Sequence, residues 1–418
     1  MDASSLSLSE LTKMEDYDPN SMQVEQARHL IRQFLKPLSQ VETISLQQAF
    51  QRTLAADVQS PINVPPHDYS AMDGYAASHA DLQQAPRRLK VVGTAFAGRP
   101  FDGRIAAGEC VRIMTGALIP SGCDSVVMQE HVRVHGDEIE VGDGHKRGQN
   151  IRLVGEDIKQ GDVVLARGRV LRGAEMGLLA SLGFASVNVY RKLRVAIFST
   201  GDELRQPGET LGTGQIYDSN RYSLTGLLTE LGADIIDLGN IRDDKDTIRA
   251  TLQHASSHAD VIITSGGVSV GEADFIKQLL AELGEVVFWK LAMKPGRPLA
   301  YGKVGQCHFF GLPGNPVAVM VTFLQFVSDA LRVLMGQVPK PAFTFRAITT
   351  TPIRKAVGRT EFQRGILSQD ADGRWLVAAT GDQGSGILSS MTRANCFIVL
   401  PMEQGNAAAG LEVQVQLL

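Results

Sequence analysis

Acidic residues and glycines follow a buried-looking apolar run at residues 261–275, a combination suited to binding phosphate and a metal ion. The run Val261-Ile-Ile-Thr264 leads into Ser265-Gly-Gly267, where glycine lets a backbone approach a ligand closely. Glu272 and Asp274 come next, just before a helical pattern. A strand, a glycine turn and a helix start form an anion cradle, and Mg²⁺ prefers oxygen ligands. The stretch therefore predicts a site for phosphate and a hard cation.

Two further loops have the same design, Phe198-Ser-Thr-Gly-Asp-Glu-Leu204 and Phe310-Gly-Leu-Pro-Gly-Asn-Pro316. Ligands of open α/β sheets bind beyond the carboxyl ends of the strands, and parallel strands bring those ends to one edge. One such loop alone is more often an ordinary turn. Three loops at one edge, two of them acidic, favour a shared site. Asp243, which follows the apolar run at 235–238, is expected at the same edge.

Three cations lie close together in Trp289-Lys-Leu-Ala-Met-Lys-Pro-Gly-Arg-Pro298. They are Lys290, Lys294 and Arg297. A solvated basic face is the alternative interpretation, but the rigid Pro-Gly-Arg-Pro backbone favours a role in neutralising an anionic substrate. The four cysteines are scattered, which supports neither a zinc cage nor a disulfide framework.

Strand–helix alternation over residues 191–338 predicts a parallel sheet with helices on both faces. Residues 61–147 read as a β-rich insert between two parts of one mixed α/β domain, 22–60 and 148–190. Residues 339–418 read as a carboxyl-terminal β domain. Within the first part, Ser45 is expected to cap a helix that continues through Arg52. The predicted fold class is therefore multidomain, α/β plus β.

The 418 residues are 44% apolar and carry a net charge of −4, as in a globular protein with no general affinity for nucleic acid. Residues 1–20 lack the pattern of a signal peptide, and we expect an unstructured tail there. The longest apolar stretch, around 317–327, is too short to span a bilayer. We expect a cytoplasmic protein with no membrane contact.

Motifs along the chain resemble those of the MoeA and gephyrin E-domain family. In the central region they are Ser199-Thr-Gly-Asp-Glu-Leu204, Tyr217-Asp-Ser-Asn220, Thr264-Ser-Gly-Gly-Val-Ser-Val-Gly-Glu-Ala-Asp274, Lys294-Pro-Gly-Arg-Pro298 and Gly311-Leu-Pro-Gly-Asn-Pro316. Elsewhere they are Ser70-Ala-Met-Asp-Gly-Tyr-Ala76, Met114-Thr-Gly-Ala117, Asn150-Ile-Arg152, Gly155-Glu-Asp157 and Phe362-Gln-Arg-Gly365. The resemblance runs from residue 22 to the carboxyl terminus. It implies that the central domain is a doubly wound molybdopterin-binding domain and that the last domain is barrel-like.

Proteins of this family insert molybdate into the dithiolene of adenylylated molybdopterin and release AMP, assisted by Mg²⁺. With these substrates in view, the candidate residues fall into three groups. Those for Mg²⁺ and the hydrolytic water are Glu203, Asp243 and Asp274. Those for the phosphates and the pterin pocket are Ser265, Gly266, Gly267, Pro313, Asn315 and Pro316. Those for the anionic substrate and molybdate are Lys290, Lys294, Arg297, Arg364 and Ser385, with Ser389 as a weaker alternative.

The resemblance also implies an elongated homodimer with a site shared between subunits. Asp73, Thr115 and Asp157, as catalytic candidates, and Arg152, as a substrate-binding one, would line the cleft from the second subunit. A turn or interdomain role is the alternative for these four. Transient contacts with the adenylyltransferase and with molybdoenzyme apoproteins are further expectations. Two other functions stay open: a molybdopterin adenylyltransferase, which the extra domains disfavour, and a gephyrin-like scaffold.

Overall fold

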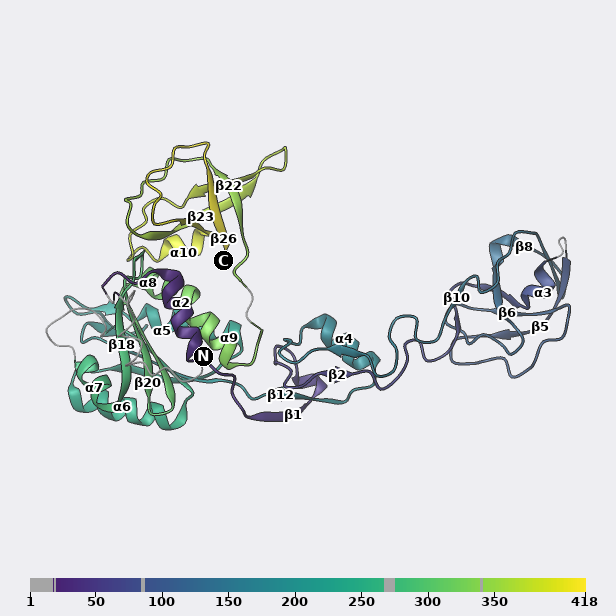
Figure 1. Ribbon diagram of the computed structural model, residues 1–418, viewed down its shortest axis with the longest axis horizontal. Coiled ribbons are helices and arrows are strands. Elements are labelled where there is room, and N and C mark those ends of the chain that lie inside the picture. The colour runs from purple at the N-terminus through teal and green to yellow at the C-terminus, as the bar shows by residue number, and fades with distance from the viewer. Residues whose placement is uncertain (1–17, 19, 84–86, 267–274, 339–340) are drawn as a thin grey trace, which may run out of the picture.

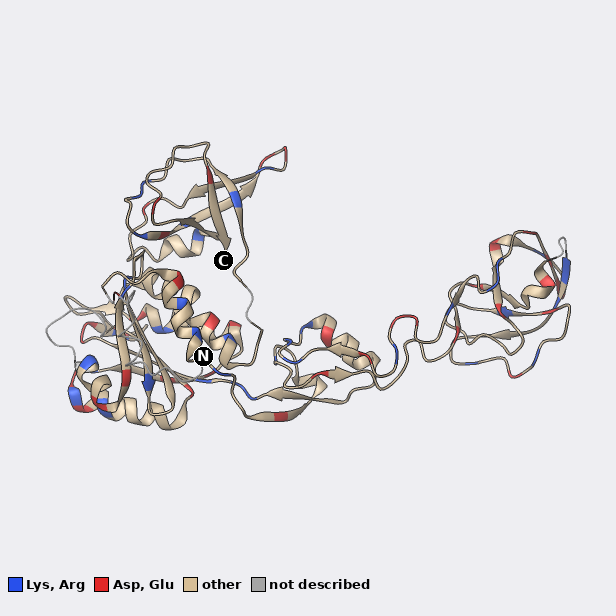
Figure 2. Ribbon diagram, in the orientation of Figure 1, with Lys and Arg blue, Asp and Glu red and all other residues tan. Residues whose placement is uncertain are grey.

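The computed structural model describes residues 18, 20–83, 87–266, 275–338 and 341–418. The expected tail at 1–20 lies almost wholly outside these residues. Figure 1 shows an extended molecule. An α/β unit lies at one end with the carboxyl-terminal β unit beside it, and a slender arm leads to another β unit at the far end. Acidic and basic side chains are interspersed over all parts (Figure 2), in keeping with the small net charge.

One mixed sheet of order β16-β13-β17-β21-β20-β18 forms the centre of the α/β unit. Its strands are β13 (Arg194–Thr200), β16 (Asp234–Ile241), β17 (Val261–Ser265), β18 (Gly284–Lys290), β20 (Pro298–Val304) and β21 (Cys307–Leu312). β16, β13, β17 and β21 are parallel, as predicted. β20 runs antiparallel to both of its neighbours, which corrects the prediction of an all-parallel sheet. A tight turn at Gly305, where φ is +61°, makes the β20–β21 hairpin.

Helices cover both faces of this sheet. They are α5 (Ser219–Leu231), α6 (Lys245–His258), α7 (Phe275–Leu283), α8 (Pro316–Thr322), the π-helical segment η3 (Phe323–Val327) and α9 (Ser328–Leu334). Along β13, Val195 and Ile197 join the core on one face, whereas Ala196 and Phe198 join the core on the other. This period of two buries the strand on both sides and confirms the doubly wound architecture.

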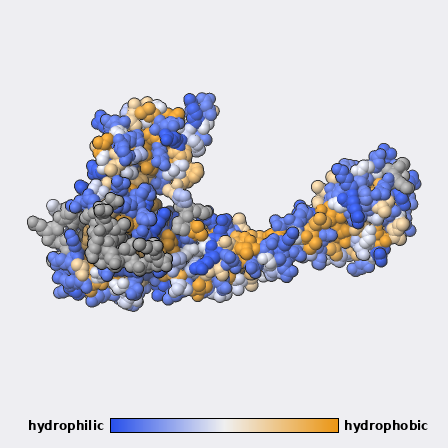
Figure 3. Space-filling view, viewed as in Figure 1, coloured by the Kyte–Doolittle hydropathy of each residue, from blue (hydrophilic) through white to orange (hydrophobic). Residues whose placement is uncertain are grey.

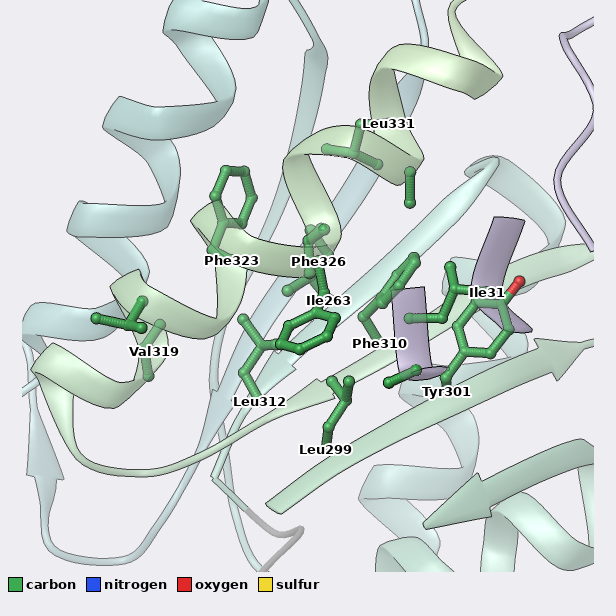
Figure 4. Packing of buried hydrophobic residues seen from close by; sticks show 14 of the residues in the cluster. Ile31, Ile263, Leu299, Tyr301, Phe310, Leu312, Val319, Phe323, Phe326 and Leu331 are labelled. Atoms are coloured by element: carbon green, nitrogen blue, oxygen red, sulfur yellow. The ribbon is translucent and has the colours of Figure 1, made fainter. Parts of the chain in front are cut away.

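The run Pro316–Leu334 has the length and apolar composition of a membrane span, the one such helix among the residues described. However, 72% of its apolar window is buried inside the protein, so it also fits the role of a core helix. Phe323, Phe326 and Leu331 of this run belong to the same core as Phe310 and Leu312 of the sheet, and Figure 4 shows these residues together.

The amino-terminal helix α2 (Val24–Gln33) also packs on the central unit. Its apolar stripe, Ala27, Leu30 and Ile31, joins the same core as Tyr301, and Figure 4 shows Ile31 close to that ring. The predicted grouping of 22–60 with 148–190 stays a prediction, and the structure adds that this helix shares the core of the central unit. The boundaries at 60, 147, 190 and 338 stay predictions.

Two strand pairs build the arm. β1 (Val41–Ser45) pairs with β12 (Ser186–Tyr190), and β2 (Val58–Gln59) pairs with β11 (Val163–Leu165). The helix α4 (Gly173–Ser181) shares a small core with them. The predicted helix from Ser45 to Arg52 is wrong: β1 is followed by a single 3₁₀ turn, Leu46–Gln48. The pairing of β1 with a segment far along the chain outweighs the local helix signal.

The unit beyond the arm is a sheet of order β7-β4-β6-β5-β9-β8. Its strands are β4 (Gly74–Ala77), β5 (Arg87–Ala95), β6 (Glu109–Ile113), β7 (Ser125–Met128), β8 (Val132–His135) and β9 (Glu138–Val141), with a short helix α3 (His79–Leu82). A two-residue ladder of β3 (Tyr69–Ser70) with β10 (Ile151–Arg152) lies where the arm meets this unit (Figure 1). The β-rich insert is therefore present as predicted.

The carboxyl-terminal unit is a closed barrel. Its strands are β22 (Thr344–Thr349), β23 (Thr360–Gln369), β24 (Trp375–Ala379), β25 (Cys396–Leu400) and β26 (Glu412–Leu417), with one short helix α10 (Ser389–Arg393). Pairing of β23 with β25 closes the ring. The strand β19 (Met293–Lys294) of the central chain adds to β23, which fastens the barrel to the cation-rich loop.

Candidate functional site

The four parallel strands end side by side, and the predicted loops leave from these ends. β16, β13, β17 and β21 are neighbours in the sheet and finish at Ile241, Thr200, Ser265 and Leu312. The edge at which they finish is the one where open α/β sheets bind ligands. The convergence predicted from the sequence is therefore present.

Asn220, at the start of α5, joins two of these loops. Its Nδ2 donates to the hydroxyl oxygen of Ser265 at 2.8 Å and to the carbonyl oxygen of Gly314 at 2.7 Å. The Ser265 hydroxyl in turn lies 3.5 Å from the carbonyl oxygen of Pro313. One amide thus uses both of its N–H groups to hold the end of β17 against the turn before α8.

The turn after β17 comes very close to the end of β13. Gly266 has a φ of +89°, and a Cβ there would lie 2.8 Å from the carbonyl oxygen of Thr200. Glycine is therefore required twice, for the backbone conformation and for the space. Gly267 and Asp274 lie outside the described residues.

Carboxylates gather at the β13–β16 side of the edge. Partial burial, and then the charges of Asp202, Glu203 and Asp244, raise the pKa of Asp243. These side chains are exposed. Asp244 instead caps α6, because its carboxylate accepts from the Thr247 amide at 2.9 Å; the Thr247 hydroxyl and then this amide lower the pKa of Asp244. Among the described residues no three His, Cys, Asp or Glu side chains form a ready metal cage.

A second asparagine supports the acidic loop. Asn240, near the end of β16, donates through Nδ2 to the carbonyl oxygens of Gly201 and Leu204, each at 3.3 Å. The loop continues into the short ladder of β14 (Leu204–Arg205) with β15 (Ile216–Tyr217). Glu203 is thus held beside the end of β16, on the side where Asp243 follows.

The cation-rich loop joins the central unit to the barrel. Lys294 and Arg297 are exposed, whereas Lys290 is half-buried. The ammonium group of Lys294 lies 3.8 Å from a carboxylate oxygen of the buried Glu361 on β23. Gly296 packs against Thr322 of α8 so closely that a side chain there would collide with the threonine hydroxyl.

The barrel supplies Arg364 and Ser385 at its contact with the central unit. Arg364 is only 1% exposed, and its guanidinium donates to the Ser390 hydroxyl at 2.9 Å and the Gly384 carbonyl at 3.0 Å. Burial lowers its pKa. The carbonyl oxygen of Ser385 accepts from the Val317 amide at 3.0 Å, at the start of α8. Arg364 therefore lies behind the loop that carries Ser385, and Ser389 is exposed at the start of α10.

The other four candidates lie on the insert and its junction with the arm. The Asp73 carboxylate accepts from the Thr115 amide at 2.7 Å and from the Thr115 hydroxyl at 2.8 Å, which lowers the pKa of Asp73. Arg152 pairs with Tyr69 in the β10–β3 ladder, and the Asp157 amide donates to Val64. All four side chains are exposed. Figure 1 shows the insert at the far end of the arm from the central unit, with β10 where the arm meets it.

The sequence did not reveal that the side chains of Asn220 and Asn240 hold these loops in place. Asn220 belongs to a quoted motif, yet its partners at 265 and 314 are distant in the chain. The signal that could have pointed to it is its place two residues after Asp218, whose carboxylate caps α5 by accepting from the Arg221 amide. Asn240 carries no local signal of this kind.

An α/β sheet with glycine loops at its strand ends, a β insert on an arm and a carboxyl-terminal barrel together define a multidomain protein of the α/β plus β class. Family models match almost the whole chain: "MoeA N-terminal region (domain I and II)" at 22–183, "Probable molybdopterin binding domain" at 196–333, and "MoeA C-terminal region (domain IV)" at 346–418. The chain belongs to the MoeA family.

Curated relatives and solved structures agree with this assignment. A molybdopterin molybdenumtransferase of Haemophilus influenzae is 48% identical over 94% of this chain and 98% of its own length. A protein of the same name from Nostoc sp. is 36% identical over 90% of this chain and 88% of its own. The crystal structure of a molybdopterin biosynthesis moeA protein from Pyrococcus horikoshii has a TM-score of 0.83 at 30% identity, covering 96% of this chain and 100% of that one.

Proposed function

We propose that this chain is a molybdopterin molybdenumtransferase, a transferase of molybdenum cofactor biosynthesis. It inserts molybdate into the dithiolene of adenylylated molybdopterin, and AMP leaves as the pyrophosphate link is hydrolysed. The relatives that carry this name match nearly the full length of the chain. The observation that carries the proposal is the meeting of four loops at the strand ends of a sheet whose family model describes molybdopterin binding.

The glycine turns suit a pyrophosphate. Ser265, Gly266 and Gly267 would cradle the phosphate, and Pro313, Asn315 and Pro316 would form the wall of the pterin pocket. Asn220 holds Ser265 and the Gly314 turn at a fixed spacing, so the two sides of this cradle are already in position. Such preorganisation lowers the entropy lost on binding.

The carboxylates beside the cradle fit Mg²⁺. Glu203 and Asp243 present exposed oxygens, and the pKa of Asp243 is raised by partial burial and then by the charges of its acidic neighbours, which a cation would offset. Mg²⁺ keeps several waters and needs only one or two protein carboxylates, so a closed cage is not required. We propose Glu203, Asp243 and Asp274 as the residues that hold it. When bound, Mg²⁺ would neutralise charge on the phosphate oxygens.

Molybdate, a dianion, would bind where the cation-rich loop faces the barrel. Lys290, Lys294 and Arg297 supply positive charge on one side. On the other, Ser385 lies on a loop that Arg364 holds from behind through Gly384. We therefore assign Ser385 to direct contact with molybdate, and Arg364 to contact or to support of that loop.

We also propose a homodimer in which the insert of one subunit completes the site of its partner. Asp73, Thr115, Arg152 and Asp157 lie far from the strand ends within one chain (Figure 1), so a second copy is the natural source of these groups. Figure 3 shows apolar surface along the arm, in the part of the chain that exposes Val41, Phe50, Ile62, Leu153 and Val163. Contiguous exposed apolar surface is typical of interaction sites. Contacts with the adenylyltransferase and with molybdoenzyme apoproteins would be transient.

The proposal is tested by incubating the purified protein with adenylylated molybdopterin, Mg²⁺ and molybdate, and following AMP by chromatography. AMP release should require molybdate, and the product should activate a molybdoenzyme apoprotein. Formation of adenylylated molybdopterin from molybdopterin and Mg-ATP by this chain alone would favour the adenylyltransferase instead. AMP release that ignores molybdate would contradict molybdenum transfer.

A further inference from the structure

The helical run that follows the loop after β21 is interrupted by a π-helical turn. Over Phe323–Val327 the α-helical pattern gives way to wider hydrogen bonding, and such turns often mark functional positions. Gln325, in the middle of this turn, is only 2% exposed. Its carbonyl oxygen accepts from Nε of Arg28 on α2 at 2.9 Å. The amino-terminal helix thus bonds to the backbone of the π-helical turn.

Arg28 also fixes the orientation of the Gln325 side chain. A second guanidinium nitrogen of Arg28 donates to the Gln325 side-chain oxygen. Because arginine can only donate, this atom must be the amide oxygen, and the amide nitrogen points the other way. That nitrogen donates to Oε1 of Gln416 on β26 at 3.2 Å. The guanidinium carbon of Arg28 lies 5.8 Å from the ring centre of Phe326, which holds the cation in place.

Arg28, Gln325 and Gln416 therefore form a chain of hydrogen bonds across three parts of the molecule. Arg28 belongs to the amino-terminal helix, Gln325 to the central unit and Gln416 to the barrel. The same helix run contacts both sides of the proposed molybdate site. Its Thr322 touches Gly296 of the cation-rich loop, and its Val317 amide donates to Ser385 of the barrel.

We propose that Gln325 and Gln416 are positioning residues, which set the tilt of the barrel over the central unit and so the spacing between Lys294 and Ser385. This inference rests on the proposed function, since it assumes that molybdate binds between those two loops. Neither glutamine touches the substrate in this arrangement. Loss of their bond lets the barrel shift about its β19–β23 attachment and weakens the site for molybdate while leaving the phosphate cradle unchanged.

Three variants of the barrel strand test the proposal. Gln416→Leu keeps the size but removes the acceptor, whereas Gln416→Glu keeps an acceptor for the Gln325 amide. Gln414→Leu, at an exposed position of the same strand, is the matched control. The KM for molybdate should rise roughly two- to tenfold in Gln416→Leu, the effect of one partly buried hydrogen bond, with the KM for adenylylated molybdopterin unchanged. Gln416→Glu and Gln414→Leu should behave like the unaltered protein.

Amide hydrogen exchange gives a readout that does not depend on activity. The peptide containing Val317 should exchange faster in Gln416→Leu and at the normal rate in Gln416→Glu. Equal exchange and an equal KM for molybdate in all three variants would overturn the positioning role. Absence of any molybdate-dependent reaction, with the exchange difference present, would overturn the proposed function and leave only the link between the units.

Discussion

Asp243 is both a proposed Mg²⁺ ligand and a member of a cluster of carboxylates that repel one another. Asp243→Asn removes a carboxylate whose pKa is raised by partial burial and then by the charges of the neighbouring carboxylates. We expect the Mg²⁺ concentration for half-maximal AMP release to rise by about tenfold or more, the usual scale for damage to a metal site. Asp246→Asn, an exposed carboxylate in the first turn of α6, is the control and should leave this concentration unchanged.

Asp243→Asn should weaken Mg²⁺ binding, but it should slightly stabilise the metal-free protein. Because the folded-state pKa of Asp243 is raised, the folded protein holds the proton to higher pH than the unfolded chain. Stability is therefore lost as pH rises through the region just above the ordinary value of 3.8. Asp243→Asn should abolish that loss and slightly raise the melting temperature at pH 7 without Mg²⁺. A lower melting temperature would contradict the repulsion.

His308, on β21, should make the protein sensitive to mild acid. Burial lowers its pKa to about 4, against an ordinary value of 6.5. Since the unfolded chain takes up the proton first, stability should fall as pH drops from 6.5 toward 4, by up to about 3 kcal/mol. His308→Phe, which can keep the stacking on Tyr301, should flatten this dependence in urea unfolding at pH 7, 5.5 and 4.5. Exposed His254→Phe should not.

Individual site residues were predictable to very different degrees. Ser265 and Asp243 follow apolar strands within a few residues, so a local pattern was enough to place them at the sheet edge. Asn220 and Asn240 hold carbonyl groups that come from other loops, and no local pattern encodes such partners. Arg364 was predicted as a molybdate contact, and that role stays a prediction; the structure adds that the side chain is nearly completely buried and bonded to the Gly384 carbonyl.

At the scale of elements, the turn after β17 comes so close to the end of β13 that few side chains should be tolerated at position 266. Gly266→Ala would place a methyl group 2.8 Å from the Thr200 carbonyl and force a side chain into a φ of +89°. We expect the KM for adenylylated molybdopterin to rise at least about tenfold, since the cradle must open to relieve the contact. Binding by calorimetry would measure this directly.

Gly358→Ala separates the effect of backbone strain from the effect of the contact with Thr200. Gly358 has a similar φ of +96°, but a Cβ there meets nothing within 4 Å. This variant should lose about 1 kcal/mol of stability from backbone strain and bind substrate normally. Equal loss of binding in both variants would show that the contact with Thr200 is not what matters.

Elements with strong local signals were predicted well, and those made by distant pairing were not. The strand Val261–Ser265 and the helix expected after position 274 carry their signals in the sequence, and both formed as expected. The segment after Ser45 has a helix-like start, but β1 before it pairs with Ser186–Tyr190. The reversed strand β20 was likewise hidden, because the alternation of strands and helices does not state direction.

At the scale of the whole molecule, a site shared between subunits predicts rescue between two inactive variants. Asp73→Asn alters the insert and Asp243→Asn the central unit, so each homodimer should be impaired at both sites. A mixed dimer would contain one site with both changes and one with neither. Random mixing by co-expression should therefore recover about a quarter of the normal activity.

The control for this rescue is the doubly substituted chain, Asp73→Asn with Asp243→Asn, mixed with itself. It should recover nothing. If the site were completed within one chain, the mixture of single variants would be as inactive as its parents. Light scattering should independently give about twice the chain mass of 45.2 kDa.

The position of α2 has a consequence for how the chain is made. Ribosomes deliver residues 24–33 early, yet the surface that buries this helix includes Tyr301 and Leu331, which emerge much later. The arm has the same delay, because β1 must wait for β12 while the entire insert is translated between them. Contacts of such long sequence separation form slowly. We expect the insert to fold first on the nascent chain. Chaperones should bind α2 until the surface that buries it has been translated.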